Sequence, residues 1–104
     1  MGVKIMIERK FKEVPNEEDL RAIDELRIKA LRQKGYIGGE TIVNSDNPKE
    51  VLVLSAWSSL EDWEKWVKDQ ERNALEVRLA SRLEVPARIR AFLPSADYAK
   101  EKFG

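Results

Sequence analysis

Two charged residues fall on otherwise apolar faces, and they are the first candidates for chemistry in this sequence. Arg9 occupies the inward parity of an alternating segment that begins at Val3, and Glu76 shares a helical stripe with Leu79 and Leu83. A charge that leaves water is costly unless it is paired or partly solvated. Two interpretations of Arg9 therefore stay open: its long side chain reaches solvent from the strand end, or it lines a cavity.

The three tryptophans are the second candidate feature, because all of them fall in the stretch VLVLSAWSSLEDWEKW. The first half of this stretch is apolar on both faces and predicts a covered strand that ends at Trp57. The second half has helical spacing. We expect Trp63 in the core, whereas Trp66 lies at the margin of the apolar stripe, where it can contact a ligand or a partner chain. A pocket, if the protein has one, should have its wall here.

The residue types that the sequence lacks restrict the chemistry further. It contains no cysteine and no histidine, which excludes disulfides, thiolate metal sites and iron–sulfur clusters. The absence of histidine removes the usual proton carrier near neutral pH and any Ser-His or Cys-His nucleophile. Acid–base chemistry must then use a perturbed Glu, Asp, Lys or Tyr. We find no carboxylate cluster with the spacing of a metal site, and we expect neither a metal nor a cofactor.

Length and charge set the broad class of protein. The 104 residues suffice for one domain with a real core, and the 19 basic and 19 acidic residues balance. Nucleic acids and anionic membranes are normally met by a basic excess, so we expect neither as a partner. No apolar run approaches the length needed to cross a membrane. We therefore expect a soluble, cytoplasmic protein.

The elements that would position these residues follow from changes in hydrophobic period. Pro15 and Asn16 cap a first helix, and the pair Ser58 and Glu61 has the capping-box spacing for a second. A polar cluster at 69–73 interrupts that second helix and predicts a kink or a break. In chain order we expect a strand from Val3 to Phe11, a helix from Asn16 to Gly35, a strand from Tyr36 to Asn44, a turn at 45–48, a strand from Val51 to Trp57, the interrupted helix, a strand from Val85 to Leu93 and a short helix or tail at 95–103.

The order strand, helix, strand, strand, helix, strand predicts an α+β fold of the ferredoxin-like, split βαβ type. Its four-stranded antiparallel sheet has the first and third strands at the centre. Pro86 favours an edge position for the last strand. The segment KGYIGG invites comparison with the RNA-recognition motif, which shares this order of elements. The third strand lacks the further aromatic residues that RNA binding requires, so we do not expect RNA as a ligand.

Together with this order, the segments GYIGGETI and AWSSLEDWEKWVKDQE resemble the antibiotic biosynthesis monooxygenase domain family. The resemblance covers roughly residues 3 to 93, so we expect one such domain over 1–94, followed by a short helix or tail over 95–104. It implies a homodimer, the dimeric α/β barrel, in which two sheets pack face to face. It also implies a pocket in each subunit between sheet and helices. The face of the sheet away from the helices would carry mixed charges that can pair across a two-fold axis, namely Glu8, Lys10, Glu40, Arg88 and Arg90 beside Met6.

The resemblance also bears on individual residues. The haem-degrading branch of the family has an asparagine, a tryptophan and a histidine at three positions that fall on Arg9, on Trp57 and near Glu76. Two of the three are changed here, and without histidine ordinary haem ligation is lost, which disfavours haem degradation. The resemblance places Arg9 and Glu76 across one cavity, where we expect an ion pair.

Two functions follow as alternatives. The first is a cofactor-independent monooxygenase of a small phenol- or quinol-like compound, with Trp57, Arg9 and Glu76 as catalytic residues. Tyr36 and Trp66 would contact the substrate, and Tyr36 is the alternative to Glu76 as proton acceptor. The second is a non-catalytic dimeric module that binds a small hydrophobic ligand or serves as an accessory protein, with the ion pair filling the pocket. A cavity of at least about 300 Å³ would favour the enzyme, and a sealed pair would favour the module.

Overall fold

The computed structural model describes residues 2–104. Its elements are the strands β1 (Val3–Lys10), β2 (Tyr36–Val43), β3 (Glu50–Trp57) and β4 (Arg88–Phe92), and the helices α1 (Glu17–Ala30), α2 (Leu60–Val67), α3 (Gln70–Ala80) and α4 (Ser95–Phe103). The sheet has the order β2-β3-β1-β4 with every neighbouring pair antiparallel. The predicted α+β ferredoxin-like fold, with the first and third strands central, is confirmed.

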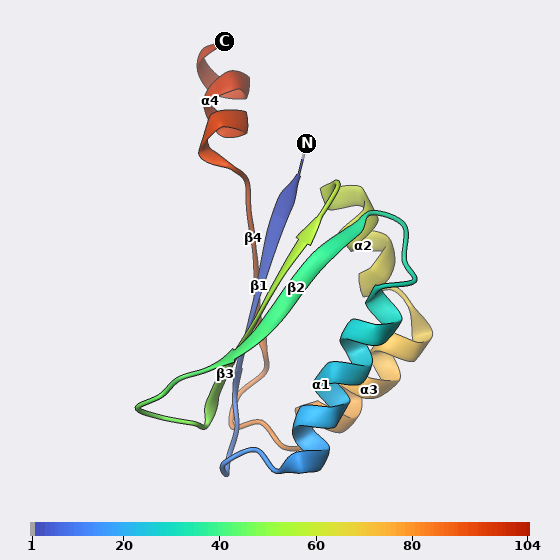
Figure 1. The fold of residues 1–104 in the computed structure, drawn as a ribbon, viewed down its shortest axis with the longest axis vertical. Coiled ribbons are helices and arrows are strands. Elements are labelled where there is room, and N and C mark those ends of the chain that lie inside the picture. The colour runs from blue at the N-terminus through green and yellow to red at the C-terminus, as the bar shows by residue number, and fades with distance from the viewer. Residues whose placement is uncertain (1) are drawn as a thin grey trace.

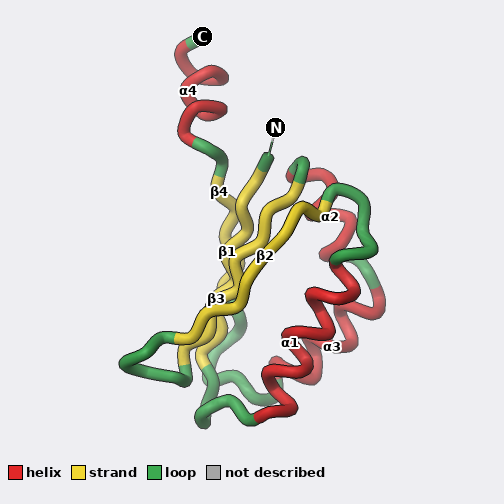
Figure 2. Tube along the Cα trace, viewed as in Figure 1, coloured by secondary structure: helices red, strands yellow, loops and turns green. Residues whose placement is uncertain are grey.

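The molecule has two layers and one projecting helix. Helices α1, α2 and α3 lie on one face of the sheet, and α4 extends away from the body beyond the end of β4 (Figure 1). The same separation between helices and strands is clear in the tube view (Figure 2). The core lies between the layers, where the odd-numbered residues of β1 are buried, including Ile5 and Arg9. Among the described residues, no helix is long and apolar enough to span a membrane.

The helix starts show how local sequence builds the helical layer. Asn16 caps α1, as predicted, and it also forms a complete capping box with Asp19. The second cap differs by one residue from the prediction, because Ser59 caps α2 by accepting from the amide of Asp62. Ser58 instead lies between β3 and α2, where its backbone amide donates to the carbonyl oxygen of Gly35 at 2.7 Å. The predicted interruption is a true break, since Asp69 caps a separate helix α3.

Several predicted boundaries are corrected by the structure. Helix α1 ends at Ala30, five residues before Gly35, and Gly35 instead adopts a positive φ of 88° in the turn that leads to β2. Strand β4 begins at Arg88, so Val85 lies outside it. As predicted, β4 is an edge strand.

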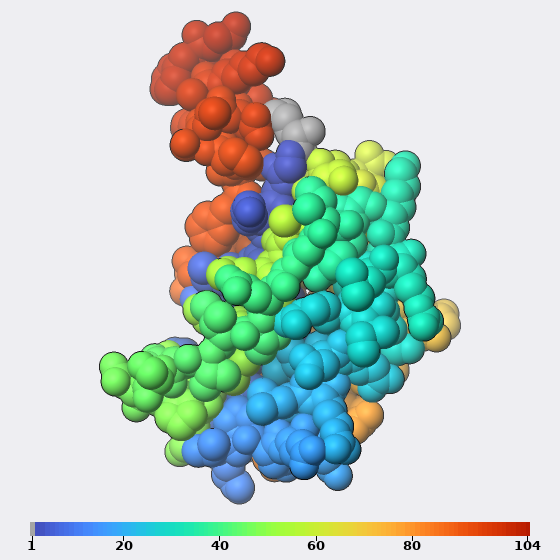
Figure 3. All heavy atoms as spheres, in the orientation of Figure 1, coloured from blue at the N-terminus to red at the C-terminus, as the bar shows by residue number. Residues whose placement is uncertain are grey.

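The face of the sheet away from the helices is more apolar than the sequence suggested. The cross-strand pairs Met6 with Leu54 and Ile42 with Leu52 lie on it, and Phe92 lies beside them. Of the predicted mixed charges, Glu8 and Arg90 pair within the chain at 2.8 Å. In the space-filling view α4 stands clear of the body (Figure 3), and none of its residues is buried.

Candidate functional site

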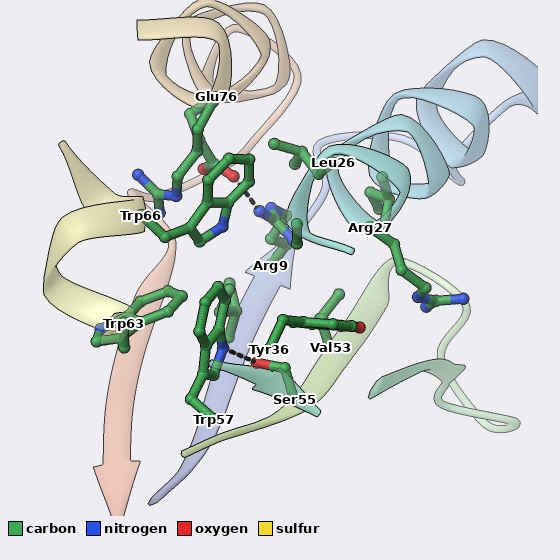
Figure 4. Close-up of a pocket in the computed structure, with 14 residues that line it drawn as sticks. Arg9, Leu26, Arg27, Tyr36, Val53, Ser55, Trp57, Trp63, Trp66 and Glu76 are labelled. Atoms are coloured by element: carbon green, nitrogen blue, oxygen red, sulfur yellow. Dashed lines mark hydrogen bonds and ion pairs between the residues drawn. The ribbon is translucent and has the colours of Figure 1, made fainter. Parts of the chain in front are cut away.

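A small cavity lies between the sheet and the helical layer. Its volume is about 40 Å³, which is room for about one or two water molecules. Four aromatic side chains and four charged ones contribute to its wall, from every element of the body except β4: Tyr36, Trp57, Trp63, Trp66, Arg9, Arg27, Arg72 and Glu76. All five residues predicted for the site are among them, and Figure 4 shows them around one space.

Arg9 and Glu76 form the predicted ion pair across this cavity. Arg9 Nη2 donates to Glu76 Oε1, which joins β1 to α3 (Figure 4). The side chain of Arg9 is 2% exposed, so the interpretation in which it reaches solvent from the strand end is wrong. The side chain of Glu76 is 20% exposed and therefore borders both cavity and solvent. The roles of the two residues in chemistry stay predictions.

The hydrogen bonding of Arg9 is incomplete. A guanidinium carries five N–H donors. Within residues 2–104, its Nε is buried and has no hydrogen-bond partner. Because a buried unpaired donor is costly, this Nε–H marks a place where a ligand atom can bind by accepting its hydrogen bond.

Arg72 is a second buried cation at the cavity, and the sequence analysis missed it. Only 6% of the residue is exposed. Its guanidinium lies 5.6 Å from the ring centre of Trp63 and donates to the carbonyl oxygen of Val67 at 3.4 Å. Burial lowers the pKa of Arg72, Glu76 opposes that shift and Arg9 adds to it. Asp69 also raises the pKa of Arg72, so Glu76 is the carboxylate that acts on both guanidinium groups.

Trp57 is held in a fixed orientation at the end of β3. Its indole Nε1 donates to Ser55 Oγ at 3.2 Å, and its ring packs edge to face against Tyr36 and Trp63 with centroids 5.2 and 5.8 Å apart. The residue is 1% exposed. Ser55, which the sequence analysis did not identify, is buried at 8% exposure. The strand therefore presents a rigid aromatic wall with its polar nitrogen satisfied.

Tyr36 closes the side of the cavity next to β2. The backbone of β2 lies close to its neighbours at Gly39, where a Cβ would lie 2.8 Å from the Tyr36 hydroxyl oxygen. The pairing of β2 with β3 shifts register between Tyr36 and Gly38, as at a β-bulge. Burial raises the pKa of Tyr36, against the effect of Arg27. The raised pKa keeps the Tyr36 hydroxyl neutral near pH 7, and its role as a proton acceptor stays a prediction.

The two tryptophans of α2 also have defined places. Trp63 and Trp66 are 7% and 5% exposed, and both line the cavity. Trp66 lies alongside the Arg9–Glu76 pair in Figure 4, and its burial leaves little of it for a partner chain. Its contact with a ligand stays a prediction. Arg27 points away from the pair and donates to Thr41 Oγ1.

No group of three or more carboxylate ligands that could hold a metal occurs within residues 2–104. The polar groups at the cavity are instead two buried guanidinium ions, one carboxylate, one phenol and one serine hydroxyl. Such a set can hold an anion and accept a proton, beside an aromatic wall that stacks on a planar ring.

The comparisons with known proteins show the family of this chain. The sequence profile described as antibiotic biosynthesis monooxygenase matches residues 3–78. The chain belongs to this family. The match includes every residue of the candidate site, since the last of them is Glu76. No curated protein gave a match.

Solved structures share the fold of this family member at low sequence identity. A conserved protein from Methanosarcina mazei Go1 has a TM-score of 0.81 at 14% identity, over 88% of this chain and 91% of its own. SnoaB, a cofactor-independent oxygenase from Streptomyces nogalater, has a TM-score of 0.80 at 12% identity, over 89% and 92%. Rv0793 from Mycobacterium tuberculosis has a TM-score of 0.80 at 10% identity, over 90% and 95%. At these identities the likeness concerns the fold.

Proposed function

We propose that this family member is a cofactor-independent oxygenase of a small phenol- or quinol-like compound. The observation that carries the proposal is the buried Arg9 guanidinium, which lines the same cavity as Trp57 and keeps an unpaired Nε. A cation at this position favours the deprotonated form of a bound phenol. The family membership, and the fold shared with the oxygenase SnoaB, support the reaction class.

The reaction needs no external reductant, because the substrate supplies the electrons. Glu76 accepts the phenol proton, and the phenolate transfers an electron to dioxygen. Recombination of the two radicals forms a carbon–oxygen bond, and the peroxide anion takes the proton back from Glu76. The hydroperoxide then loses water, which carries off the hydrogen of the attacked carbon, and a carbonyl group remains. A phenol and one O₂ thus give a quinone and one H₂O. The part of the protein in this scheme is to bind and orient the ring, stabilise the anion at Arg9 and take the proton.

The size of the cavity sets a condition on this function. At about 40 Å³ it is far below the volume of about 300 Å³ that we expected of an enzyme pocket. A substrate therefore needs a displacement of the wall, and Glu76 is the lining charge that borders solvent. Binding should accordingly depend on the Arg9–Glu76 pair.

Oxygen uptake with a panel of phenols and quinols tests the proposal. Uptake should be lost in Arg9→Ala and Trp57→Phe, because one removes the anion partner and the other removes the indole wall. Arg21→Ala and Tyr98→Phe are matched controls at exposed positions and should keep the activity. Uptake that is unchanged in both site variants would remove these residues from the mechanism.

The cavity volume specifically favours a second candidate, a non-catalytic module in which the Arg9–Glu76 pair fills the pocket. In that case the protein binds no phenol and consumes no oxygen with any member of the panel. Replacement of the pair by two apolar residues would then leave every property except stability unchanged.

We also propose that the chain forms a homodimer through the uncovered face of its sheet. Met6, Leu52 and Leu54 lie on this face at the centre of the sheet without helices above them. Burial of such a surface against a second copy is favourable. Light scattering should give the mass of a dimer, and a dilute monomer would contradict the proposal.

A further inference from the structure

The side edge of the Arg9 guanidinium is only half used. This edge consists of the Nε–H and the Nη2 N–H that lies parallel to it, a pair of donors that matches the two oxygens of a carboxylate. In this chain Nη2 donates to Glu76 Oε1, while Nε is buried without a partner in the described part of the chain. Glu76 therefore binds the edge through one oxygen where a carboxylate can bind through two.

The charges around the cavity favour an anion. Its lining contains the three cations Arg9, Arg27 and Arg72 and the single anion Glu76. Arg27 turns outward to Thr41, which leaves two guanidinium groups and one carboxylate at the centre. Asp69, the N-cap residue of α3, also raises the pKa of Arg72. The Asp69 carboxylate, however, already accepts a hydrogen bond from the backbone amide of Arg72. With two buried cations and one carboxylate at its centre, the cavity favours an anionic ligand over a neutral one.

Glu76 can leave this position more easily than Arg9 can. Its side chain is 20% exposed, whereas that of Arg9 is 2% exposed. An outward turn would hydrate the carboxylate and add the volume of the side chain to the cavity. Arg9 would meanwhile stay fixed on its central strand, already dehydrated and oriented toward the vacated space.

We infer that the ligand of this site carries an aromatic carboxylate, which replaces Glu76 on the side edge of Arg9. The inference rests on the proposed function and narrows its substrate class to hydroxylated aromatic acids. The exchange preserves the number of buried charges, and the aromatic ring gives the ligand contacts with Trp57 and Trp66 that Glu76 cannot make. In such a complex Arg9 holds the carboxylate, and Arg72 is the second buried cation at the cavity, placed to stabilise the phenolate. Once released from Arg9, the Glu76 carboxylate can accept the proton of the phenol, so binding of the acid would supply the base.

Calorimetric titration without oxygen tests the exchange apart from any turnover. The probes are 4-hydroxybenzoate and its uncharged analogue 4-hydroxybenzamide, which have nearly the same shape. We expect the acid to bind about 10- to 100-fold more tightly, the usual range for hydrogen bonds to a charged group. Equal affinities for acid and amide, or no heat of binding with either at millimolar concentration, would overturn the inference.

Two variants separate the exchange from general binding. Glu76→Gln should raise the affinity for the acid about tenfold and leave that for the amide unchanged, because the resident side chain loses its charge but keeps its shape. Arg9→Lys should abolish the preference for the acid, since a lysine ammonium cannot bind two oxygens side by side. Glu71→Gln, on the exposed side of the same helix, is the matched control and should have no effect.

The Glu76→Gln variant keeps a hydrogen-bond acceptor for Arg9 and should therefore fold, so the test does not depend on whether Arg9→Lys folds. Circular dichroism checks the folding of both variants. Weaker binding of the acid to Glu76→Gln would overturn the exchange.

The inference and the proposed function fail in different ways. Preferential binding of the acid without oxygen uptake would contradict the oxygenase, whereas equal uptake with acidic and uncharged phenols would contradict only the carboxylate site.

Discussion

Two arginine–carboxylate pairs join distant parts of this chain, and they are built differently. Arg82 donates to both oxygens of Asp19, from Nε and Nη2, at 3.1 to 3.3 Å. Asp19 also accepts from the backbone amide of Asn16. Arg9 instead uses one nitrogen toward one oxygen of Glu76 and keeps a buried Nε unpaired.

The buried partner also differs between the two pairs. In the pair at the start of α1 the acid is buried and the arginine is 36% exposed, whereas in the cavity the arginine is buried and the acid borders solvent. The Asp19 carboxylate accepts hydrogen bonds at both oxygens and holds α1 against the end of α3. A buried cation with a donor left over is suited to exchange of its partner. The structural pair, Asp19 with Arg82, thus has its hydrogen bonds satisfied, whereas the pair at the candidate binding site, Arg9 with Glu76, does not.

Removal of the cavity carboxylate should have the largest effect on stability. Glu76→Ala leaves Arg9 buried without an anion, and we expect a loss of about 3 to 5 kcal/mol in the free energy of unfolding. Arg9→Met should cost much less, because Glu76 can turn toward water. Denaturant unfolding of both variants measures this difference.

The double variant Arg9→Met with Glu76→Leu sharpens the same point. It removes both charges, so we expect stability within about 1 kcal/mol of the parent. A double variant as unstable as Glu76→Ala would mean that lost packing, and not an unpaired charge, explains the first result.

The pair at the start of α1 should have an intermediate effect with the opposite asymmetry. Asp19→Ala removes both a helix cap and the partner of Arg82, with an expected cost of about 2 kcal/mol. Arg82→Met should cost less, because Asp19 keeps its capping interactions. Thermal unfolding with calorimetric enthalpies gives both values. Equal losses in the two variants would contradict the assigned difference.

The smallest expected effect is on pH dependence. Burial alone would raise the pKa of Asp19, but the hydrogen bonds from Arg82 and Asn16 outweigh burial and hold the pKa below its ordinary value of 3.8. The folded state therefore gains stability from Asp19 above about pH 4, and loses it as the pH falls through the lowered pKa. Asp19→Asn should be about 1 kcal/mol less stable than the parent at pH 7. Unfolding at a series of pH values should show the gap closing in acid, and a constant gap would contradict the lowered pKa.

Much of this site follows from local periodicity. A period of two in β1 places Arg9 inward, and a period of 3.6 places Glu76 on the stripe of Leu79. The pattern is strongest in β1, where Val3, Ile5 and Ile7 are buried at the same parity as Arg9. It is weaker in α3, where Leu79 is buried but Ala80 is exposed. The strand end at Trp57 was predictable for the same reason.

Other features depend on information that no short segment contains. The sequence does not decide whether Ser58 or Ser59 caps the helix, because each serine is followed three residues later by an acid. Arg72 lies within a polar cluster that marks a helix break, and only the fold brings Trp63 over its guanidinium. The cavity volume is likewise a sum over packed side chains from six elements.

The most direct test of the site follows the Nε–H of two arginines by nuclear magnetic resonance. In the protein labelled with nitrogen-15, Arg82 provides an internal control, because its Nε already donates to Asp19. On addition of 4-hydroxybenzoate, we predict that the Nε–H signal of Arg9 moves downfield as it gains a carboxylate partner, while that of Arg82 stays in place. A saturating titration in which the Arg9 signal does not move would contradict the account of this cavity as a binding site.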